Sequence, residues 1–435
     1  MSIENVTQAK TAIEQTSAYK TLTAFFDGGE FTSVDALAKS QDTYAEVVAG
    51  FGEVNSKSVF AFAQNADFCG GAMSKAQAAK IKKIYDLALK TGAIVVGFYN
   101  SKGGRLDEGN ALLAGYGEML NASSKLSGVV PQISVVLGDC LGTGALNAVS
   151  ADFVIATKDA KLSLDTMGKN SDANYNAENG IVSVVADTEA DAVEKARELI
   201  NYLPENNISE TYSFEETAAE DSGCVVHRTV DAGSIYKLSA SYGKNARTVF
   251  ARINGEPVGI INTLGGALTA DDANKVAKFV RFCDAFSIRV ITFVNSNGFE
   301  DIKSAAKVSS AYAEATTVKI SVVTGTAVGA LYIALAGEGA NADVVYALPE
   351  AVISPVNPEA AALIVAPEKL NVPVSEQADV VKQFAAENLS AEKAAENGYV
   401  DDVVAMEELR GAIINASYML SGKRVETLAK KHSTI

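Results

Sequence analysis

Two glycine-rich segments are the places in this sequence where backbone chemistry could occur. Residues 138–144 (GDCLGTG) and 325–330 (GTAVGA) each follow an apolar run typical of a buried strand and precede a segment with helical periodicity. The first N–H groups of a helix lack intrahelical acceptors and carry the positive end of the helix dipole. They can stabilise an oxyanion, such as a thioester enolate or the tetrahedral intermediate of acyl transfer. Glycines there could also serve only the close packing of strand against helix, but two equivalent turns favour a paired site.

Other types of site are excluded or disfavoured by the residues present. The sequence has no GxxxxGKS/T phosphate loop, and no GxGxxG opens a helix at its first strand–helix turn. Its two histidines, His227 and His432, lie outside the glycine segments, so a Ser-His-Asp or Cys-His mechanism has no base there. The cysteines are too far apart for a zinc site, and we expect buried thiols in a reducing cytoplasm. They are Cys69, Cys140, Cys224 and Cys283.

Composition indicates an ordinary globular, acidic protein. The chain has 435 residues, of which 37 are basic and 53 acidic, giving a net charge of −16. This balance disfavours nucleic acid and anionic lipid surfaces as general partners. No basic-then-apolar signal segment opens the sequence, and the longest uncharged run, residues 320–337, is interrupted by glycines. We therefore expect a soluble, cytoplasmic protein.

The second half of the chain repeats the first. The pairs Asn100-Ser101 and Asn295-Ser296 each follow an apolar run, and the GGA triplets at 70–72 and 265–267 have the same spacing of 195 residues. The ISVV segments at 133–136 and 320–323 are 187 residues apart, which predicts a deletion of eight residues after Asn295. The chain is therefore expected to be a duplicated domain.

Both halves predict the same alternation of strands and helices. Buried strands are expected at 59–63, 94–98 and 133–137 in the first half and at 258–261, 290–294 and 320–323 in the second. Amphipathic helices separate them, and further helices are expected over 138–148 and 325–336. This order is typical of α/β domains. An acidic segment at 201–223 reads as an exposed linker, so we place the domains at 1–215 and 216–435, and residues 423–435 are expected to form a surface arm.

Charged residues near the first glycine turn leave two interpretations open. Lys80, Lys82 and Lys83 lie on the polar face of an expected helix, where they could be solvated or could bind the phosphates of coenzyme A. Arg105 and the residues after it follow Gly103 and Gly104, and their acidic members suit the first turn of a helix.

Short stretches in a fixed order extend over nearly the whole chain. They are 26–31 (FDGGEF), 62–65 (FAQN), 113–118 (LAGYGE), 130–138 (VPQISVVLG), 201–207 (NYLPENN), 279–286 (FVRFCDAF), 311–316 (AYAEAT), 398–403 (GYVDDV) and 430–432 (KKH). In these stretches the chain resembles the carboxyltransferase subunits of biotin-dependent acyl-CoA carboxylases and decarboxylases.

The resemblance implies two tandem crotonase-like ββα-superhelix domains from an internal duplication, the N-terminal one for acyl-CoA and the C-terminal one for carboxybiotin. The first oxyanion hole of the family falls on Gly142 and Thr143, and the second falls on Ala330 and Leu331. The acyl-CoA side is completed by Gly103, Gly104 and Arg105, and the biotin side by Gly298, Phe299 and Gly329. The family usually has Gly-Gly and Gly-Ala at the two holes, an Asp at Asn100 and a longer loop after Phe299.

The implied reaction moves a carboxylate between biotin and the α-carbon of a small acyl-CoA such as malonyl- or methylmalonyl-CoA. No metal is implied. Because the chain has no Met-Lys-Met biotinylation motif and no ATP-binding signature, the biotin carrier must be another chain, as must a biotin carboxylase or a membrane decarboxylase subunit. The family forms homo-oligomers, dimers or hexamers. Two alternatives remain: a biotin-independent crotonase-type hydratase or decarboxylase, and a non-catalytic assembly subunit that binds coenzyme A or the carrier.

Overall fold

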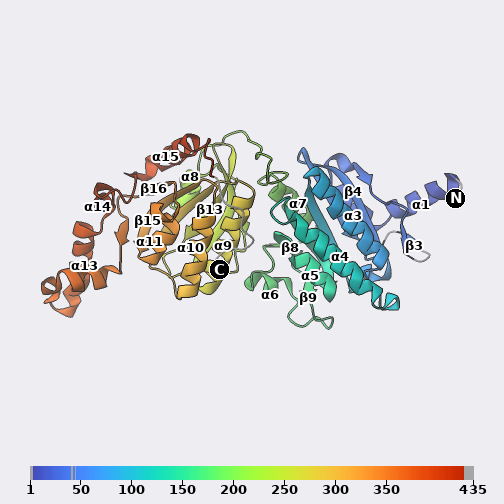
Figure 1. Cartoon of the computed structure of the whole chain (residues 1–435), viewed down its shortest axis with the longest axis horizontal. Helices are drawn as coiled ribbons and strands as arrows, with labels where there is room; N and C mark the ends of the chain where they lie inside the picture. Colours follow the sequence, from blue (N-terminus) through green and yellow to red (C-terminus); the bar gives the residue numbers. More distant parts are fainter. Residues whose placement is uncertain (1–2, 41–42, 45, 426–435) are drawn as a thin grey trace. The chain divides into compact units, whose positions relative to one another are not determined.

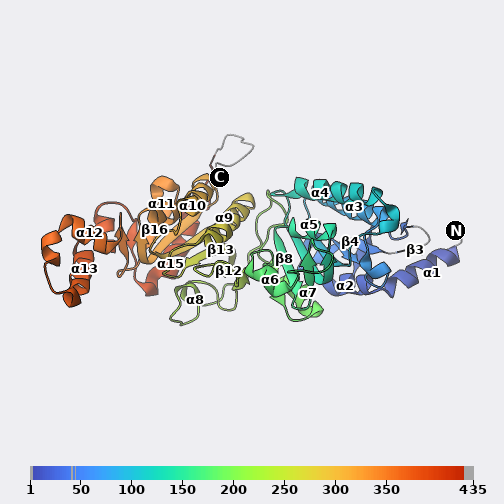
Figure 2. The same cartoon turned by 90° about the horizontal axis from the view of Figure 1, so that it is seen from below.

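The computed structural model of the protein describes residues 3–40, 43–44 and 46–425 and divides the chain into two compact units, Met1–Tyr212 and Ser213–Ile435. Each unit contains an eight-stranded mixed sheet with helices on both faces (Figures 1 and 2). In the first unit the strand order is β1-β4-β5-β6-β7-β8-β10, with β9 paired to β7. In the second it is β11-β12-β13-β14-β15-β16-β18, with β17 paired to β15. The α/β fold expected from the sequence is confirmed, and the two units share one topology.

The first unit contains the following elements. They are α1 (Ile3–Glu14), α2 (Ser17–Phe25), η1 (Asp27–Gly29), β1 (Phe31–Ser33), β2 (Lys39–Ser40), β3 (Thr43–Tyr44), β4 (Val47–Val54), β5 (Lys57–Gln64), η2 (Cys69–Gly71), α3 (Lys75–Thr91), β6 (Ile94–Ser101), η3 (Leu106–Glu108), α4 (Ala111–Leu126), β7 (Gln132–Leu141), α5 (Thr143–Val149), β8 (Phe153–Thr157), β9 (Lys161–Ser163), α6 (Ala173–Glu178), β10 (Val184–Ala186) and α7 (Glu189–Ile200). Helices α3 and α4 cover one face of the sheet, and α2 and α7 cover the other (Figure 2).

The second unit repeats this plan and adds helices near its C-terminal end. Its elements are α8 (Val225–Thr229), β11 (Tyr236–Leu238), β12 (Ala246–Ile253), β13 (Glu256–Thr263), α9 (Ala270–Ala285), β14 (Val290–Ser296), α10 (Ile302–Glu314), β15 (Lys319–Val328), α11 (Ala330–Ala336), η4 (Glu338–Ala340), β16 (Val344–Ala347), β17 (Val352–Ser354), α12 (Pro358–Val365), η5 (Pro367–Leu370), α13 (Val374–Asn388), α14 (Ala391–Glu396), β18 (Asp402–Val403) and α15 (Met406–Met419). Helices α9 and α10 cover one face, and α8 and α15 the other (Figure 2).

The lengths of equivalent elements account for the predicted deletion of eight residues. The loop after β14, residues 297–301, is four residues shorter than the loop after β6, residues 102–110. Helix α10 is three residues shorter than α4, and the connection that follows it is one residue shorter. From there β7 and β15, like α5 and α11, have equal lengths.

Local sequence signals explain where the helices that flank the glycine turns begin and end. The Ser74 side chain accepts the N–H of Gln77 at the start of α3, and α3 ends at Gly92 in the left-handed region, with φ 71°. Thr269 begins α9 with a full capping box, because the Asp272 side chain reaches back to the Thr269 N–H. These caps fix each helix over the core strands that lead to the turns.

Two expectations about these elements were wrong. The strands do not end at Leu137 and Val323 but continue to Leu141 and Val328, because their last residues pair with the short strands β9 and β17. The helices after them are correspondingly shorter than the predicted 138–148 and 325–336, since α5 begins at Thr143 and α11 at Ala330.

The segment expected to be an exposed linker is anchored at its beginning. Tyr202 and Leu203 are buried, and the buried Lys57 side chain donates hydrogen bonds to the carbonyls of Ile200 (2.7 Å) and Leu203 (2.6 Å). A lysine with only carbonyl acceptors loses solvation, so burial lowers the pKa of Lys57 to about 8. The end of the first unit is thus tied to β5.

Burial of the cysteines follows the prediction only in part. All four are free thiols, of which Cys140 and Cys283 are buried, Cys224 is half-buried and Cys69 is exposed. No helix within the described residues is long and apolar enough to cross a membrane. Of the predicted surface arm only residues 423–425 are described, and His432 lies outside the described residues.

Candidate active site

The first glycine turn joins β7 to α5 through a single residue. Gly142 stands between the last strand residue and the first helical one with φ 70° and ψ −147°, a conformation that residues with a Cβ rarely adopt. Its N–H donates a 2.9 Å hydrogen bond to the Ser163 carbonyl, which extends the pairing of β7 with β9 by one residue. The Gly142 N–H is therefore already used by the fold.

The second turn has the same geometry. Gly329 joins β15 to α11 with φ 52° and ψ −122°, and its N–H donates a 2.8 Å hydrogen bond to the Ser354 carbonyl of β17. A Cβ built on Gly329 would lie 2.9 Å from the Pro355 carbonyl oxygen, so the turn requires glycine for space as well as for conformation.

These hydrogen bonds show which of the predicted donors already has an acceptor within the fold. Because Gly142 and Gly329 occupy equivalent positions, Thr143 corresponds to Ala330 and Gly144 to Leu331. The predicted pairs, 142–143 and 330–331, are one residue out of step with each other. No acceptor among the described residues takes the N–H of Thr143, Gly144, Ala330 or Leu331. Gly142 therefore shapes the first turn, and the two N–H groups that remain available there belong to Thr143 and Gly144.

Each unit has a second turn, which follows the strand beside β7 or β15. These strands are β6 in the first unit and β14 in the second. Gly103 (φ 127°) and Gly298 (φ 136°) each donate an N–H to the hydroxyl of a serine two residues earlier, Ser101 or Ser296, over 3.3 Å. In each unit the carbonyl of this glycine accepts the N–H of a residue that precedes α3 or α9, at 2.8 and 2.9 Å. Gly104 and Phe299 follow in these fixed loops, so the structure places both predicted turns at equivalent positions of the two units.

One asparagine in each unit packs its side chain against the neighbouring strand that leads to the glycine turn, a role that the sequence alone did not assign. The Asn100 side chain covers Gly138, where an added Cβ would lie 2.6 Å from Asn100 Oδ1. The Asn295 side chain covers Gly325 in the same way, and its Oδ1 accepts the N–H of Thr326 at 3.1 Å. The signal for this role was present in the repeated Asn-Ser pair.

Arg105 is engaged by carboxylates. Its guanidinium donates to Glu46 Oε1 at 2.8 Å and to Asp107 Oδ2 at 2.7 Å. These hydrogen bonds, of which the one to Asp107 has the larger effect, raise the pKa of Arg105 above its usual range. Contact with the acyl-CoA, which the resemblance implies for Arg105, would compete with these two carboxylates.

The three lysines of helix α3 are neither simply solvated nor free to bind a phosphate. Lys80 is buried and donates to the Val47 carbonyl at 2.9 Å, so its predicted place on the polar face of the helix was wrong. Lys82 pairs with Asp86 at 2.6 Å and Lys83 with Asp35 at 2.5 Å. In this structure each of the three already has an oxygen partner.

Side-chain nucleophiles and bases contribute little at the first turn. Burial raises the pKa of the Cys140 thiol to about 12, so it is not a thiolate near neutral pH. His227 lies on α8 and contacts Glu220 through Nδ1 at 2.9 Å, far along the chain from the glycine turns. The chemistry available at both turns is that of backbone N–H groups.

A cavity adjoins the turn of the second unit. It has a volume of about 590 Å³, and Gly329 and Ala330 form part of its wall together with Ile353, Leu389 and Tyr399. Its walls come from α11, β17 and the α13–α14 region, so the N-terminal end of α11 borders a space large enough for a small cyclic ligand.

Comparison with known proteins identifies the family. The carboxyl transferase domain family matches residues 15–435, nearly the whole chain. The chain belongs to the carboxyl transferase domain family.

Relatives of established name in this family cover the chain almost completely. The α subunit of methylmalonyl-CoA decarboxylase from Veillonella parvula is 33% identical over 476 residues, which span 96% of this chain and 92% of the relative. The β chain of propionyl-CoA carboxylase from Roseobacter denitrificans is 30% identical over 444 residues, which span 89% of this chain and 85% of the relative.

A solved structure of the family has the same fold. It is a transcarboxylase 12S crystal structure, described as a hexamer assembly with methylmalonyl-coenzyme A and methylmalonic acid bound. Its TM-score is 0.92 at 30% identity, and the alignment covers 99% of this chain and 98% of that one. The predicted tandem crotonase-like carboxyltransferase fold is thereby confirmed, and the chain is a carboxyltransferase subunit.

Proposed function

We propose that this carboxyltransferase moves a carboxyl group between biotin on a separate carrier protein and the α-carbon of a small carboxyacyl-CoA, with methylmalonyl-CoA as the leading candidate. The observation that carries the proposal is the pair of N–H groups, without an acceptor among the described residues, that recurs at the same position in both units. The named relatives that act on methylmalonyl- or propionyl-CoA support the choice of substrate.

Two such pairs suit the two oxyanions of this reaction. When the carboxylate leaves the α-carbon of methylmalonyl-CoA as carbon dioxide, the electron pair of the broken C–C bond moves into the thioester carbonyl and forms an enolate. Biotin, when bound, would supply N1 as the acceptor of the carbon dioxide; N1 would give its proton to the α-carbon of the enolate, and its ureido oxygen would carry negative charge that backbone N–H groups can stabilise. Backbone N–H groups held by a rigid turn stabilise such charge without reorganisation. We assign the thioester oxygen to Thr143 and Gly144 and the ureido oxygen to Ala330 and Leu331.

The remaining site assignments follow from this division. Gly103, Gly104 and Arg105 would border the acyl-CoA, while Gly298, Phe299 and Gly329 would border the biotin. The cavity beside Gly329 and Ala330 supports the second assignment, because its apolar walls suit the fused rings of biotin. The biotin-independent alternative calls for acid or base side chains at the turns, and within residues 138–144 Asp139 is the one candidate.

The proposal includes partners and a location. A biotin carrier must dock on the chain, and a biotin carboxylase or a membrane decarboxylase subunit must complete the reaction cycle. The hexamer assembly of the transcarboxylase 12S structure supports a dimer or a hexamer. The four free cysteines suit the reducing cytoplasm.

The test is decarboxylation of methylmalonyl-CoA and malonyl-CoA by the purified protein, with and without free biotin. We expect product whose rate rises with biotin concentration and is highest for one of the two thioesters. Turnover that does not respond to biotin would overturn the proposal in favour of a crotonase-type decarboxylase. Binding of coenzyme A without turnover of either thioester would overturn it in favour of an assembly subunit.

A further inference from the structure

The two units differ on one face of their sheets. In the first unit Val48 of β4 and Ala63 of β5 lie opposite each other and are buried beneath α2. Helix α2 reaches the end of β5, because Ser17 at its start donates its hydroxyl to Asn65 Oδ1 at 3.4 Å. Phe25 at the other end of α2 packs on Phe98, with ring centroids 5.1 Å apart. This face is closed by apolar side chains.

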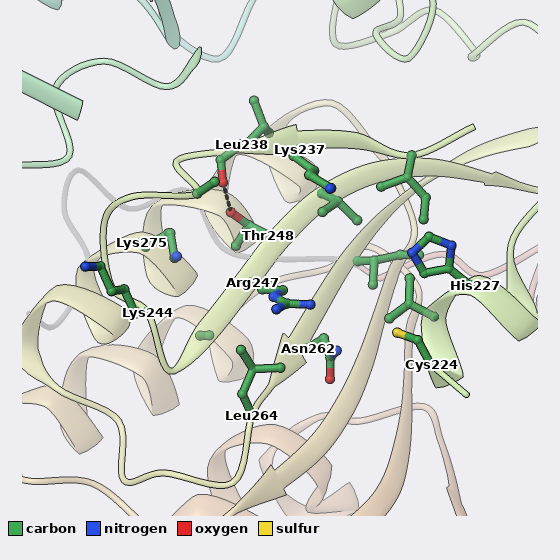
Figure 3. Close-up of a pocket in the computed structure, with 16 residues that line it drawn as sticks. Cys224, His227, Lys237, Leu238, Lys244, Arg247, Thr248, Asn262, Leu264 and Lys275 are labelled. Atoms are coloured by element: carbon green, nitrogen blue, oxygen red, sulfur yellow. Dashed lines mark hydrogen bonds between the residues drawn. The ribbon is translucent and has the colours of Figure 1, made fainter. Parts of the chain in front are cut away.

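In the second unit the equivalent helix is too short to close that face. Helix α8 has five residues where α2 has nine, so about one helical turn is absent. The residues at the positions of Val48 and Ala63 are Arg247 and Asn262, which are Cα partners on β12 and β13. A cavity of about 400 Å³ opens here, with Arg247 and Asn262 in its wall (Figure 3).

The cavity has a cationic rim. Lys237, Lys244 and Arg247 line it and are exposed, and no aspartate or glutamate is among its lining residues. Among the residues that the structure describes, no hydrogen bond or ion pair joins any of these three side chains to an acceptor. Two other basic side chains of the wall are engaged: Lys275 Nζ donates to the Gly243 carbonyl at 2.7 Å, and His227 contacts Glu220. The free charges are therefore those at the mouth.

A buried amide lies between these charges and the floor. The Asn262 residue is 92% buried, with 8% of its surface exposed, and no described residue forms a hydrogen bond with its side chain. The Asn262 side-chain nitrogen and oxygen remain accessible from the cavity, so a ligand or water there can form hydrogen bonds with them. Figure 3 shows Asn262 beside Arg247 on the neighbouring strand.

Apolar residues form another part of the wall. Val249 and Ile260 form the next pair of opposite residues on the same face of β12 and β13, and both are buried. Ile235 and Leu264 also line the cavity. The cavity thus pairs one anion-binding end with an apolar end.

We propose that this cavity is a binding site for an organic monocarboxylate with an apolar chain. Arg247 would donate two N–H groups to the carboxylate, and the Asn262 amide would donate a third hydrogen bond. The alkyl chain would lie over Val249 and Ile260. A cavity of this size has room for octanoate, a ligand of roughly ten non-hydrogen atoms. None of the lining residues belongs to the glycine turns, so the proposal stands independently of the function proposed above.

Isothermal titration calorimetry of the full chain with octanoate tests the proposal. We expect a single saturable binding event for octanoate. 1-Octanol, which lacks the carboxylate, and inorganic phosphate, which lacks the alkyl chain, should each bind at least about tenfold more weakly. Arg247→Met keeps the aliphatic stem and should weaken octanoate binding by about tenfold or more. Asn262→Leu keeps the volume and should weaken it by about fivefold.

A matched control separates the site from general charge effects. Lys382 is an exposed lysine on α13, outside the cavity, and Lys382→Met should bind octanoate as the unmodified chain does. Arg247 is exposed, so its substitution should leave the thermal unfolding midpoint unchanged. The proposal is overturned if octanoate does not bind the unmodified chain, if Arg247→Met binds it equally well, or if phosphate binds as tightly as octanoate.

Discussion

A proline at the first residue of α5 or α11 would test the oxyanion assignment directly. Proline removes one N–H but fits the first position of a helix, where that N–H has no intrahelical acceptor. Thr143 and Ala330 are both exposed, and neither donates its N–H to a described acceptor. Thr143→Pro and Ala330→Pro therefore delete a candidate catalytic donor without deleting a hydrogen bond of the fold.

The structure sets the expected size of both effects. Because no intramolecular hydrogen bond is lost, we expect the free energy of unfolding to change by less than about 1 kcal/mol. Each turn has two available N–H groups, and removal of one donor from an oxyanion hole lowers kcat by roughly 100- to 1000-fold, or about 3–4 kcal/mol. The effect should fall on kcat more than on KM, since the charge develops only as the reaction proceeds.

The assay is biotin-dependent decarboxylation of the preferred thioester, followed for each variant beside its control. Ala270→Pro and Glu189→Pro place proline at the first residue of α9 and α7, at exposed positions outside the glycine turns, and should keep the full rate. If Thr143→Pro or Ala330→Pro folds normally and retains a rate within about threefold of the unmodified chain, the corresponding turn does not bind the oxyanion.

Two further predictions concern stability. Gly329→Ala should lower the free energy of unfolding by about 2 kcal/mol in urea titration, because φ is 52° and the new Cβ would lie 2.9 Å from the Pro355 carbonyl oxygen. The control is Gly117→Ala, in the interior of α4, where an added Cβ has no neighbour within 4 Å. This substitution should instead raise the free energy of unfolding by up to about 1 kcal/mol. An equal effect of the two substitutions would contradict the conformational argument. Burial lowers the pKa of Lys57 from 10.5 to about 8, so between these values the unfolded chain binds more protons than the folded one and stability rises with pH. Near pH 9 this lysine should contribute a slope of about 1.2 kcal/mol per pH unit, and a slope unchanged in Lys57→Met would show that it is not the source.

The sequence alone determined the organisation of the chain. The duplication, the buried core strands and the position of the glycine turns all follow from spacing and apolar runs, because these signals are local to each segment. The repeated Asn-Ser pairs at 100–101 and 295–296 marked the strand ends on which the second pair of turns depends. The predicted family rested on ordered stretches along the whole chain and is confirmed by the match over residues 15–435.

Only the tertiary structure decided which groups are available for chemistry. The N–H of Gly142 is used because β9, about twenty residues further along the chain, extends the ladder to Ser163, and no local pattern indicates that pairing. The sequence places Lys80 on the polar face of its helix, yet in the structure its ammonium group is in the interior and donates a hydrogen bond to the Val47 carbonyl. The cavity at Arg247 exists because α8 is shorter than α2. Hydrogen-bond partners and cavities depend on segments distant in sequence, and periodicity does not record them.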